Sequence, residues 1–189
     1  MLVEDLIGKS ATLGTREVHL IRQSCGQFIR ESGGFPIYKN LPTSYNDFHK
    51  VKVRQHKRRD KVVEVFNKAF SAEQANLRQR AVYSYGAVPS IQEGMETFYV
   101  FPTDGYRFLY STEVKNSGDN LRNVLDVLFE QLEQKEAVEV VVDLLKYTYS
   151  KTHLVEGILA KAEILFYGIP SYYAVRVSAC KNYRDLLTS

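Results

Sequence analysis

The chain of 189 residues contains no tryptophan and only 2 cysteines. Cys25 and Cys180 lie far apart and lack the CxxC spacing of zinc and redox sites, so the sequence predicts neither a disulfide framework nor structural zinc. Two isolated thiols are typical of a reducing compartment. The 4 histidines show no HExxH or other paired ligand spacing, and we therefore expect no metal cofactor.

Long apolar runs are also missing. The longest runs fall well short of the roughly 18 residues that a membrane span needs, so we expect no membrane association. Acidic residues interrupt the N-terminal segment at Glu4 and Asp5, and we expect no secretion through a signal peptide. Neither GxGxxG nor GxxxxGK[ST] occurs, which excludes a Rossmann dinucleotide site and a P-loop.

What remains is an ordinary globular composition, 44% hydrophobic and 25% charged, which excludes a disordered chain. The length predicts a single domain over residues 1–189, with residues 1–34 as an N-terminal helical segment packed on it. The net charge is only +3, but it is unevenly distributed. A basic run spans residues 50–61 and an acidic stretch spans residues 126–143, which predicts one basic and one acidic face.

Helical periodicity appears in residues 16–31, after Asp60, and in residues 121–132. Thr15 and Asp60 are candidate N-caps, and Gly33-Gly34 is expected to end the first helix. Residues 137–149 are predicted as a second helix or as a buried apolar segment. The pattern leaves this choice open, because their valines favour strands.

Short strands are predicted at residues 35–38, 48–53, 81–85, 164–167 and 172–177. Residues 97–101 and 106–110 flank Pro102-Thr103-Asp104-Gly105, a pattern that predicts a β-hairpin. Short strands interrupted by helices, without regular βαβ alternation, favour the α+β class over a doubly wound sheet.

Three segments together resemble a known family. They are residues 35–40 (FPIYKN), residues 78–86 (RQRAVYSYG), and residues 162–166 (AEILF) followed by residues 171–175 (SYYAV). In this order they resemble the opening, middle and closing strands of ADP-ribosyltransferase-like proteins, particularly phage-encoded ones. The resemblance covers residues 27–177 and implies an α+β fold with a split antiparallel sheet of the ADP-ribosyltransferase type and helical insertions.

The resemblance implies that NAD is consumed as a cosubstrate and that ADP-ribose passes to a host protein or a nucleic acid. Cleavage of the nicotinamide–ribose bond generates an oxocarbenium-like cation, which a nearby carboxylate stabilises. Glu163 is the carried-over catalytic carboxylate, and Ser84 is the hydroxyl that positions it. From the residues alone, a solvated Glu163 paired with Lys161 or Lys181 and a turn role for Ser84 stay open.

The resemblance also implies a set of NAD contacts, namely Tyr38, Lys39, Arg54, Arg58 and Tyr83. The sequence departs from the family at Lys39, where arginine is expected, because lysine lacks the planar fork that recognises phosphate. Lys161 lies two residues before Glu163, where many active transferases carry Glu or Gln. An inactive descendant that keeps the fold is therefore the second hypothesis. It would be a binding or virion component whose charged faces engage virion proteins or host partners.

A third hypothesis is a nucleic-acid-binding accessory protein that uses residues 50–61. Clustered Lys and Arg with Tyr45 and Phe48 nearby are typical of a phosphate contact, although such a run is also typical of a solvated face. For all of these hypotheses the expected location is the host cytoplasm or the virion.

Overall fold

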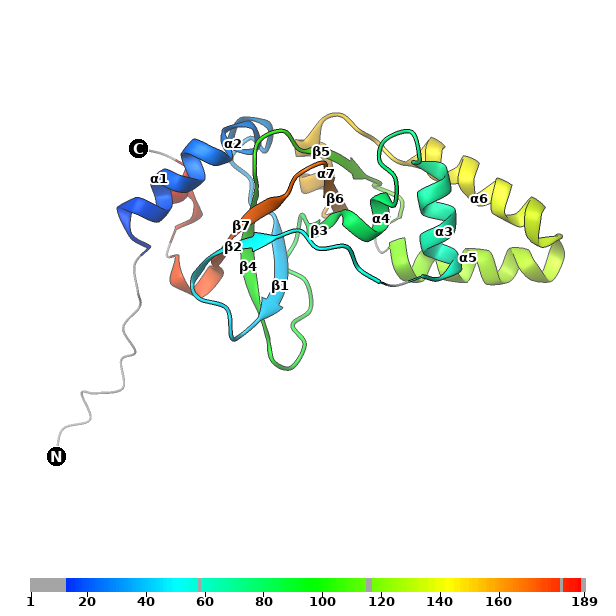
Figure 1. Cartoon of the computed structure of the whole chain (residues 1–189), viewed down its shortest axis with the longest axis horizontal. Helices are drawn as coiled ribbons and strands as arrows, with labels where there is room; N and C mark the ends of the chain where they lie inside the picture. Colours follow the sequence, from blue (N-terminus) through cyan, green and yellow to red (C-terminus); the bar gives the residue numbers. More distant parts are fainter. Residues whose placement is uncertain (1–12, 58, 115–116, 181, 188–189) are drawn as a thin grey trace.

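The computed structural model describes residues 13–57, 59–114, 117–180 and 182–187. Within them the strands form one antiparallel sheet in the order β2-β7-β4-β1-β3-β6-β5 (Figure 1). The strands are β1 (Tyr38–Pro42), β2 (Phe48–Lys52), β3 (Val82–Tyr85), β4 (Met95–Pro102), β5 (Arg107–Tyr110), β6 (Glu163–Tyr167) and β7 (Ser171–Arg176). The α-helices are α1 (Thr15–Ser24), α2 (Gly26–Glu31), α3 (Lys61–Ala69), α4 (Leu77–Arg80), α5 (Ser117–Gln131), α6 (Gln134–Thr148) and α7 (Leu154–Leu159), followed by the 3-10 turns η1 (Val177–Ala179) and η2 (Tyr183–Leu186). The predicted α+β class is confirmed. None of the helices in these residues is both long and apolar enough to cross a membrane.

The sheet narrows between β1 and β3. Strand β1 pairs with β4 along its whole length, but it pairs with β3 only where Tyr38 lies opposite Tyr85. The sheet therefore consists of a β2-β7-β4-β1 half and a β3-β6-β5 half that join at this one pair. Beyond it the two strands diverge, and side chains can reach the space between the halves.

Apolar cores cover the two faces of the β3-β6-β5 half. Ile164 and Phe166 on β6 belong to a core that includes residues of α1 and α2. Leu165 and Tyr167 alternate with them and pack in a second core under α3, α5 and α6. These three helices gather at one end of the molecule, and α1 lies at the other (Figure 1). Burial on both faces explains why residues 164–167 are apolar without alternation.

Two predictions about helices have a clear outcome. Asp60 caps α3 as predicted, since its Oδ1 accepts from the Val63 amide at 2.9 Å. The open choice for residues 137–149 is resolved as helix α6. Helices α4 and α7 were not predicted.

The single helix predicted over residues 16–31 is wrong, because Cys25 interrupts it between α1 and α2. Asp104 explains the break. Its amide donates to the Ser24 carbonyl at 2.8 Å, and its Oδ1 accepts from the Gln27 amide at 2.7 Å. The N-cap of α1 is Gly14, not the predicted Thr15.

The predicted β-hairpin is also wrong. Strands β4 and β5 flank the turn at residues 102–105, but β4 pairs with β1 and β7, whereas β5 pairs with β6. The turn instead carries Asp104 to the break between α1 and α2. The strand predicted at residues 35–38 lies later in the chain, as β1.

Candidate functional site

Glu163 is a buried acidic side chain at the first position of β6, with 4% of its surface exposed. Tyr85 on β3 lies directly opposite in the register, so both side chains project from the same face. The Tyr85 hydroxyl donates to Glu163 Oε2 at 3.3 Å. The Ser117 hydroxyl, at the start of α5, donates to Oε1. Two neutral donors thus hold the carboxylate in one orientation.

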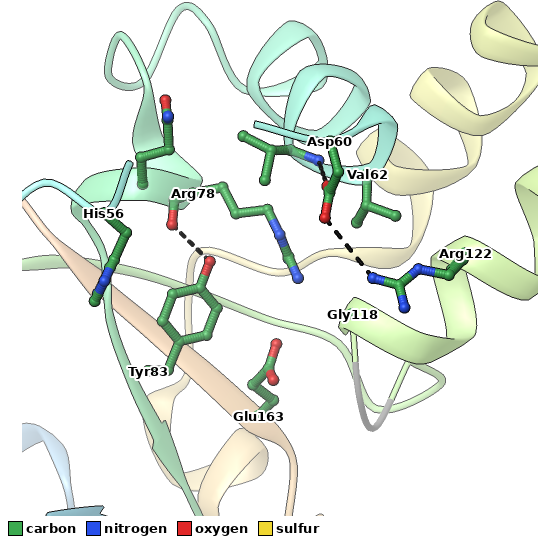
Figure 2. Close-up of a pocket in the computed structure, with 10 residues that line it drawn as sticks. His56, Asp60, Val62, Arg78, Tyr83, Gly118, Arg122 and Glu163 are labelled. Atoms are coloured by element: carbon green, nitrogen blue, oxygen red, sulfur yellow. Dashed lines mark hydrogen bonds and ion pairs between the residues drawn. The ribbon is translucent and has the colours of Figure 1, made fainter. Parts of the chain in front are cut away.

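Arg78 lies close to this carboxylate and lines the same cavity as Glu163. Its Nη1 donates to Ser117 Oγ at 2.7 Å, which links it to Glu163 through one hydroxyl. Its guanidinium lies 5.5 Å from the centre of the Tyr83 ring, and the Tyr83 hydroxyl donates back to the Arg78 carbonyl at 2.6 Å. Figure 2 shows the Arg78 side chain directed into the space above Glu163. The short helix α4 is thereby fixed to β3.

The tyrosines around Glu163 keep their protons at neutral pH. Burial, with the nearby charge of Glu163, raises the pKa of Tyr85 to about 12. Burial and the same charge also raise the pKa of Tyr149 above its ordinary value. Because both phenols stay neutral, Tyr85 remains a hydrogen-bond donor to the carboxylate.

A cavity of about 300 Å³ borders Glu163, and we call it the acidic cavity. Its wall includes Arg78, Tyr83 and His56 (Figure 2). Asp60 and Arg122 also line it, and their side chains form an ion pair at 3.7 Å. The volume lies at the lower end of the range for small-molecule sites.

A second cavity of about 530 Å³ lies where the two sheet halves diverge, and we call it the basic cavity. No aspartate or glutamate is among its lining residues, which include Lys39, His49, Lys50, Lys52, Arg54 and His56. Rings of Tyr45 and Tyr172 complete part of the wall. His56 lines both cavities, so the basic cavity adjoins the acidic one.

Lys39 reaches across the division of the sheet. It stands on β1, and its Nζ donates to the Tyr83 carbonyl on β3 at 2.8 Å. Burial lowers the pKa of Lys39 to about 8, and the charge of Glu163 offsets part of this shift. Lys39 is therefore mostly charged at neutral pH and loses its charge in mildly alkaline solution.

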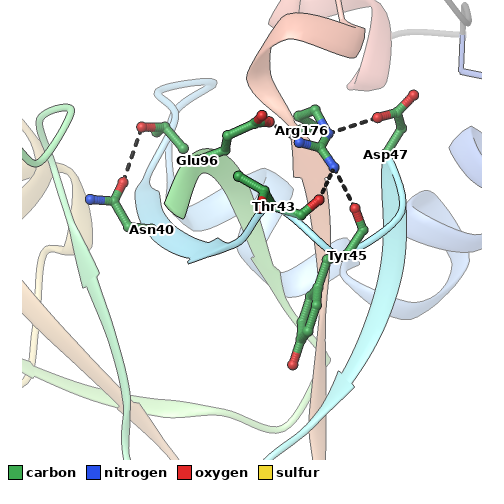
Figure 3. A network of polar contacts seen from close by, with 7 residues as sticks. Asn40, Thr43, Tyr45, Asp47, Glu96 and Arg176 are labelled. Atoms are coloured by element: carbon green, nitrogen blue, oxygen red, sulfur yellow. Dashed lines mark hydrogen bonds and ion pairs between the residues drawn. The ribbon is translucent and has the colours of Figure 1, made fainter. Parts of the chain in front are cut away.

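Arg176, at the end of β7, is the centre of a polar network with the loop between β1 and β2 (Figure 3). Its Nε donates to Asp47 Oδ1 at 2.7 Å, and its Nη1 pairs with Glu96. Its Nη2 donates to the carbonyls of Thr43 and Tyr45. These contacts fix the loop between β1 and β2, which carries the Tyr45 ring to 4.6 Å from the ring of His49.

Four of the sequence-predicted site residues line the two cavities. Glu163 and Tyr83 line the acidic cavity, and Lys39 and Arg54 line the basic one. Tyr38 lines neither, and its ring packs 5.6 Å from that of Tyr99. The predicted contact Arg58 lies outside the described residues.

Ser84 is not brought to Glu163. It pairs with Ile164, so its side chain projects from the opposite face of the sheet, into an apolar core. It is fully buried, and its Oγ has no hydrogen-bond partner among the described residues. The hydroxyls that hold Glu163 come instead from Ser117 and Tyr85, which sequence reasoning missed. Strand alternation could have indicated Tyr85 once the register was known, but no local signal points to Ser117.

The alternative of a solvated Glu163 is wrong, because the side chain is buried whereas Lys161 is exposed. Its other suggested partner, Lys181, lies outside the described residues.

In the described part of the chain no three His, Cys, Asp or Glu side chains gather in a group that could hold a metal ion. A scan against family models, a search of curated proteins and a search of solved structures each found no match.

Proposed function

We propose that this protein transfers ADP-ribose from NAD to a macromolecular acceptor. One observation carries the proposal: a buried carboxylate, held by two neutral hydroxyls, borders a cavity that adjoins a second cavity lined by cations. The order of the three sequence segments that resemble ADP-ribosyltransferase-like strands supports the same assignment.

The two cavities match two chemically different parts of the cosubstrate. The pyrophosphate of NAD is anionic and fits the basic cavity, where Lys39 and Arg54 supply positive charge. The nicotinamide ribose fits the acidic cavity beside Glu163. His56 lies in the wall of both cavities, and the proposal places the extended ligand past this residue, from one cavity to the other.

In the proposed step the bond between ribose C1′ and the nicotinamide nitrogen breaks, and its electron pair leaves with nicotinamide. The Glu163 carboxylate stabilises the positive charge that develops on the ribose. A nucleophile of the acceptor then bonds to C1′ and releases its proton to solvent. Ser117 and Tyr85 are positioning residues, since they orient the carboxylate without cancelling its charge. Ser84 has no part in this step.

A second candidate is a binding protein that keeps the site without turnover. Both oxygens of Glu163 already accept a hydrogen bond, and a lysine occupies position 39, where active relatives of the resembled family have arginine. Such a protein would bind NAD and leave the nicotinamide–ribose bond intact.

Nicotinamide release and NAD affinity, measured side by side, test the proposal. Glu163→Gln keeps the volume of the side chain, and we expect it to lower release by about 100-fold or more while NAD affinity changes little. Glu31→Gln is the matched control. Glu31 also accepts from a tyrosine hydroxyl, that of Tyr106, but it lines neither cavity.

Three results would contradict the proposal in part or in full. Equal release by wild type and Glu163→Gln would remove Glu163 as the catalytic residue. NAD binding by the wild type without any release would establish the second candidate. No NAD binding at millimolar concentration would overturn both.

A further inference from the structure

We infer that residues 50–57 and Arg59, which we call the basic segment, bind single-stranded nucleic acid along the outer edge of both cavities. This inference concerns a ligand other than NAD, and it stands whether or not NAD is cleaved. It rests on the charge of the segment, on its path across the molecule, and on the rings that lie beside it.

The cations of the basic segment are exposed and available to a ligand. Five of them are exposed in the described residues, namely Lys50, Lys52, Arg54, Lys57 and Arg59. No acidic residue interrupts the sequence between the first and the last of them. Within the described part of the chain, none of the five takes part in an ion pair that the structure records. An anionic ligand would therefore displace no carboxylate from them.

The path of the segment joins the two cavities. Strand β2 is the outermost strand of its half of the sheet, so one of its edges pairs with no other strand of the described residues. Residues 49–54 line the basic cavity, and His56 lines both cavities. The chain then continues to α3, whose capping residue Asp60 lines the acidic cavity (Figure 1). A linear polyanion bound along this segment would pass the mouth of each cavity in turn.

Aromatic rings beside the cations favour a nucleic acid with unpaired bases. Tyr45 and His49 both line the basic cavity, with ring centres 4.6 Å apart. Cations that follow a phosphate backbone, combined with rings on which bases stack, are the usual means of binding single strands. A duplex keeps its bases within the stack and would reach the cations but not the rings. A membrane surface would not enter a concave cavity.

This placement also bears on the acceptor. A strand held at the mouth of the acidic cavity would present a base or a terminal phosphate next to the bound NAD. A nucleic acid would then be the acceptor class, an extension that rests on the proposed function. The binding itself does not.

Fluorescence anisotropy with a labelled 12-nucleotide single strand and the matching duplex tests the inference in the absence of NAD. For four phosphate contacts we expect the affinity for the single strand to fall about 50-fold between 50 and 200 mM salt. The variant Lys50→Glu with Lys52→Glu should bind at least tenfold more weakly at the lower salt. Its remaining affinity should fall only about sevenfold over the same salt range, as for two contacts.

The control variant is Lys68→Glu with Lys135→Glu, which changes the net charge equally at exposed positions outside the basic segment. It should bind like the wild type, and circular dichroism should show that both variants are folded. Equal weakening by the control would overturn the inference, as would affinity that ignores salt. Tighter binding of poly-glutamate or of anionic vesicles than of the single strand would assign the segment to an acidic protein or to a membrane instead.

Discussion

Glu163 and Arg176 are both largely buried charged residues, but their surroundings are opposite. Glu163 has 4% of its residue surface exposed, and Arg176 has 14% of its side-chain surface exposed. Arg176 is engaged by two carboxylates and two main-chain carbonyls, from Asp47, Glu96, Thr43 and Tyr45. Glu163 is engaged by two neutral hydroxyls and borders a cavity.

Under the proposed function, this difference separates a structural charge from a catalytic one. A guanidinium whose three nitrogens each face a carboxylate or carbonyl has its charge neutralised, and it fastens the loop between β1 and β2 to the sheet. The Glu163 carboxylate is instead contacted directly only by neutral hydroxyls among the described residues, with Arg78 one hydroxyl away, and it borders a cavity that a ligand could enter. The number and charge of the partners, rather than burial alone, distinguish the two.

The largest expected effect is on stability, at Arg176. We expect Arg176→Met to lower the free energy of unfolding by about 2–3 kcal/mol, because it removes charge-assisted hydrogen bonds and leaves Asp47 and Glu96 without their counter-ion. Urea denaturation measures this loss. Arg16→Met, at an exposed position of α1, should change the free energy by less than about 0.5 kcal/mol.

Urea denaturation of Glu163→Gln tests whether Glu163 contributes less to stability than Arg176. This variant should lose less than about 1 kcal/mol, since the amide oxygen can still accept from one of the two hydroxyls. If it lost as much stability as Arg176→Met while retaining nicotinamide release, Glu163 would be structural as well, and the distinction would fail.

An intermediate effect concerns Lys39. Its folded-state pKa of about 8 means that it loses its charge as pH rises from 7 to 9, and the affinity for NAD should fall about tenfold over that range. Isothermal titration calorimetry measures this. Lys39→Arg should give an affinity that does not change over this range, because the guanidinium stays protonated.

The contribution of Lys39 to the free energy of unfolding should rise with pH, whereas the affinity for NAD falls. Since the pKa of Lys39 is lowered from its ordinary 10.5, the unfolded chain binds more protons at this residue between pH 8 and 10. Its contribution to the free energy of unfolding therefore rises with pH in that window. A fall in NAD affinity that tracked a fall in stability would contradict the role of Lys39 in binding the pyrophosphate.

The smallest effect is expected at Ser84. Its hydroxyl is fully buried and unpartnered among the described residues, so Ser84→Ala should leave the free energy of unfolding unchanged or raise it by about 1 kcal/mol. Nicotinamide release should stay within twofold of the wild type. A loss of release beyond tenfold at unchanged stability would return Ser84 to the site.

The helices and strands that depend on residues close in sequence were largely predictable. The Asp60 cap and the apolar face of α3 follow from spacing within a few residues, and the apolar run of β6 indicates a strand buried on both faces. The predicted continuous N-terminal helix failed at Cys25, because Asp104, far along the chain, competes for the backbone groups of Ser24 and Gln27.

The site was predictable only in part. Glu163 stands out in the sequence as a lone carboxylate opening an apolar strand, and Lys39 follows from the resemblance. Ser84 was chosen because it lies in the right segment, but the register with β6 turns it away and places Tyr85 opposite Glu163 instead. Ser117 comes from the start of a helix 46 residues away, and no spacing rule connects it to Glu163.

The sequence by itself determined the α+β class, the positions of most helices and strands, and the presence of a basic segment and of one strand-opening carboxylate. Only the tertiary structure decided that β4 and β5 do not pair with each other, that the sheet divides beside Lys39, and that Ser117 and Tyr85 hold Glu163. Helix periodicity and caps depend on contacts between near neighbours. Strand pairing and register depend on how the whole chain buries its apolar faces, and a shift of one residue exchanges the side chains on the two faces.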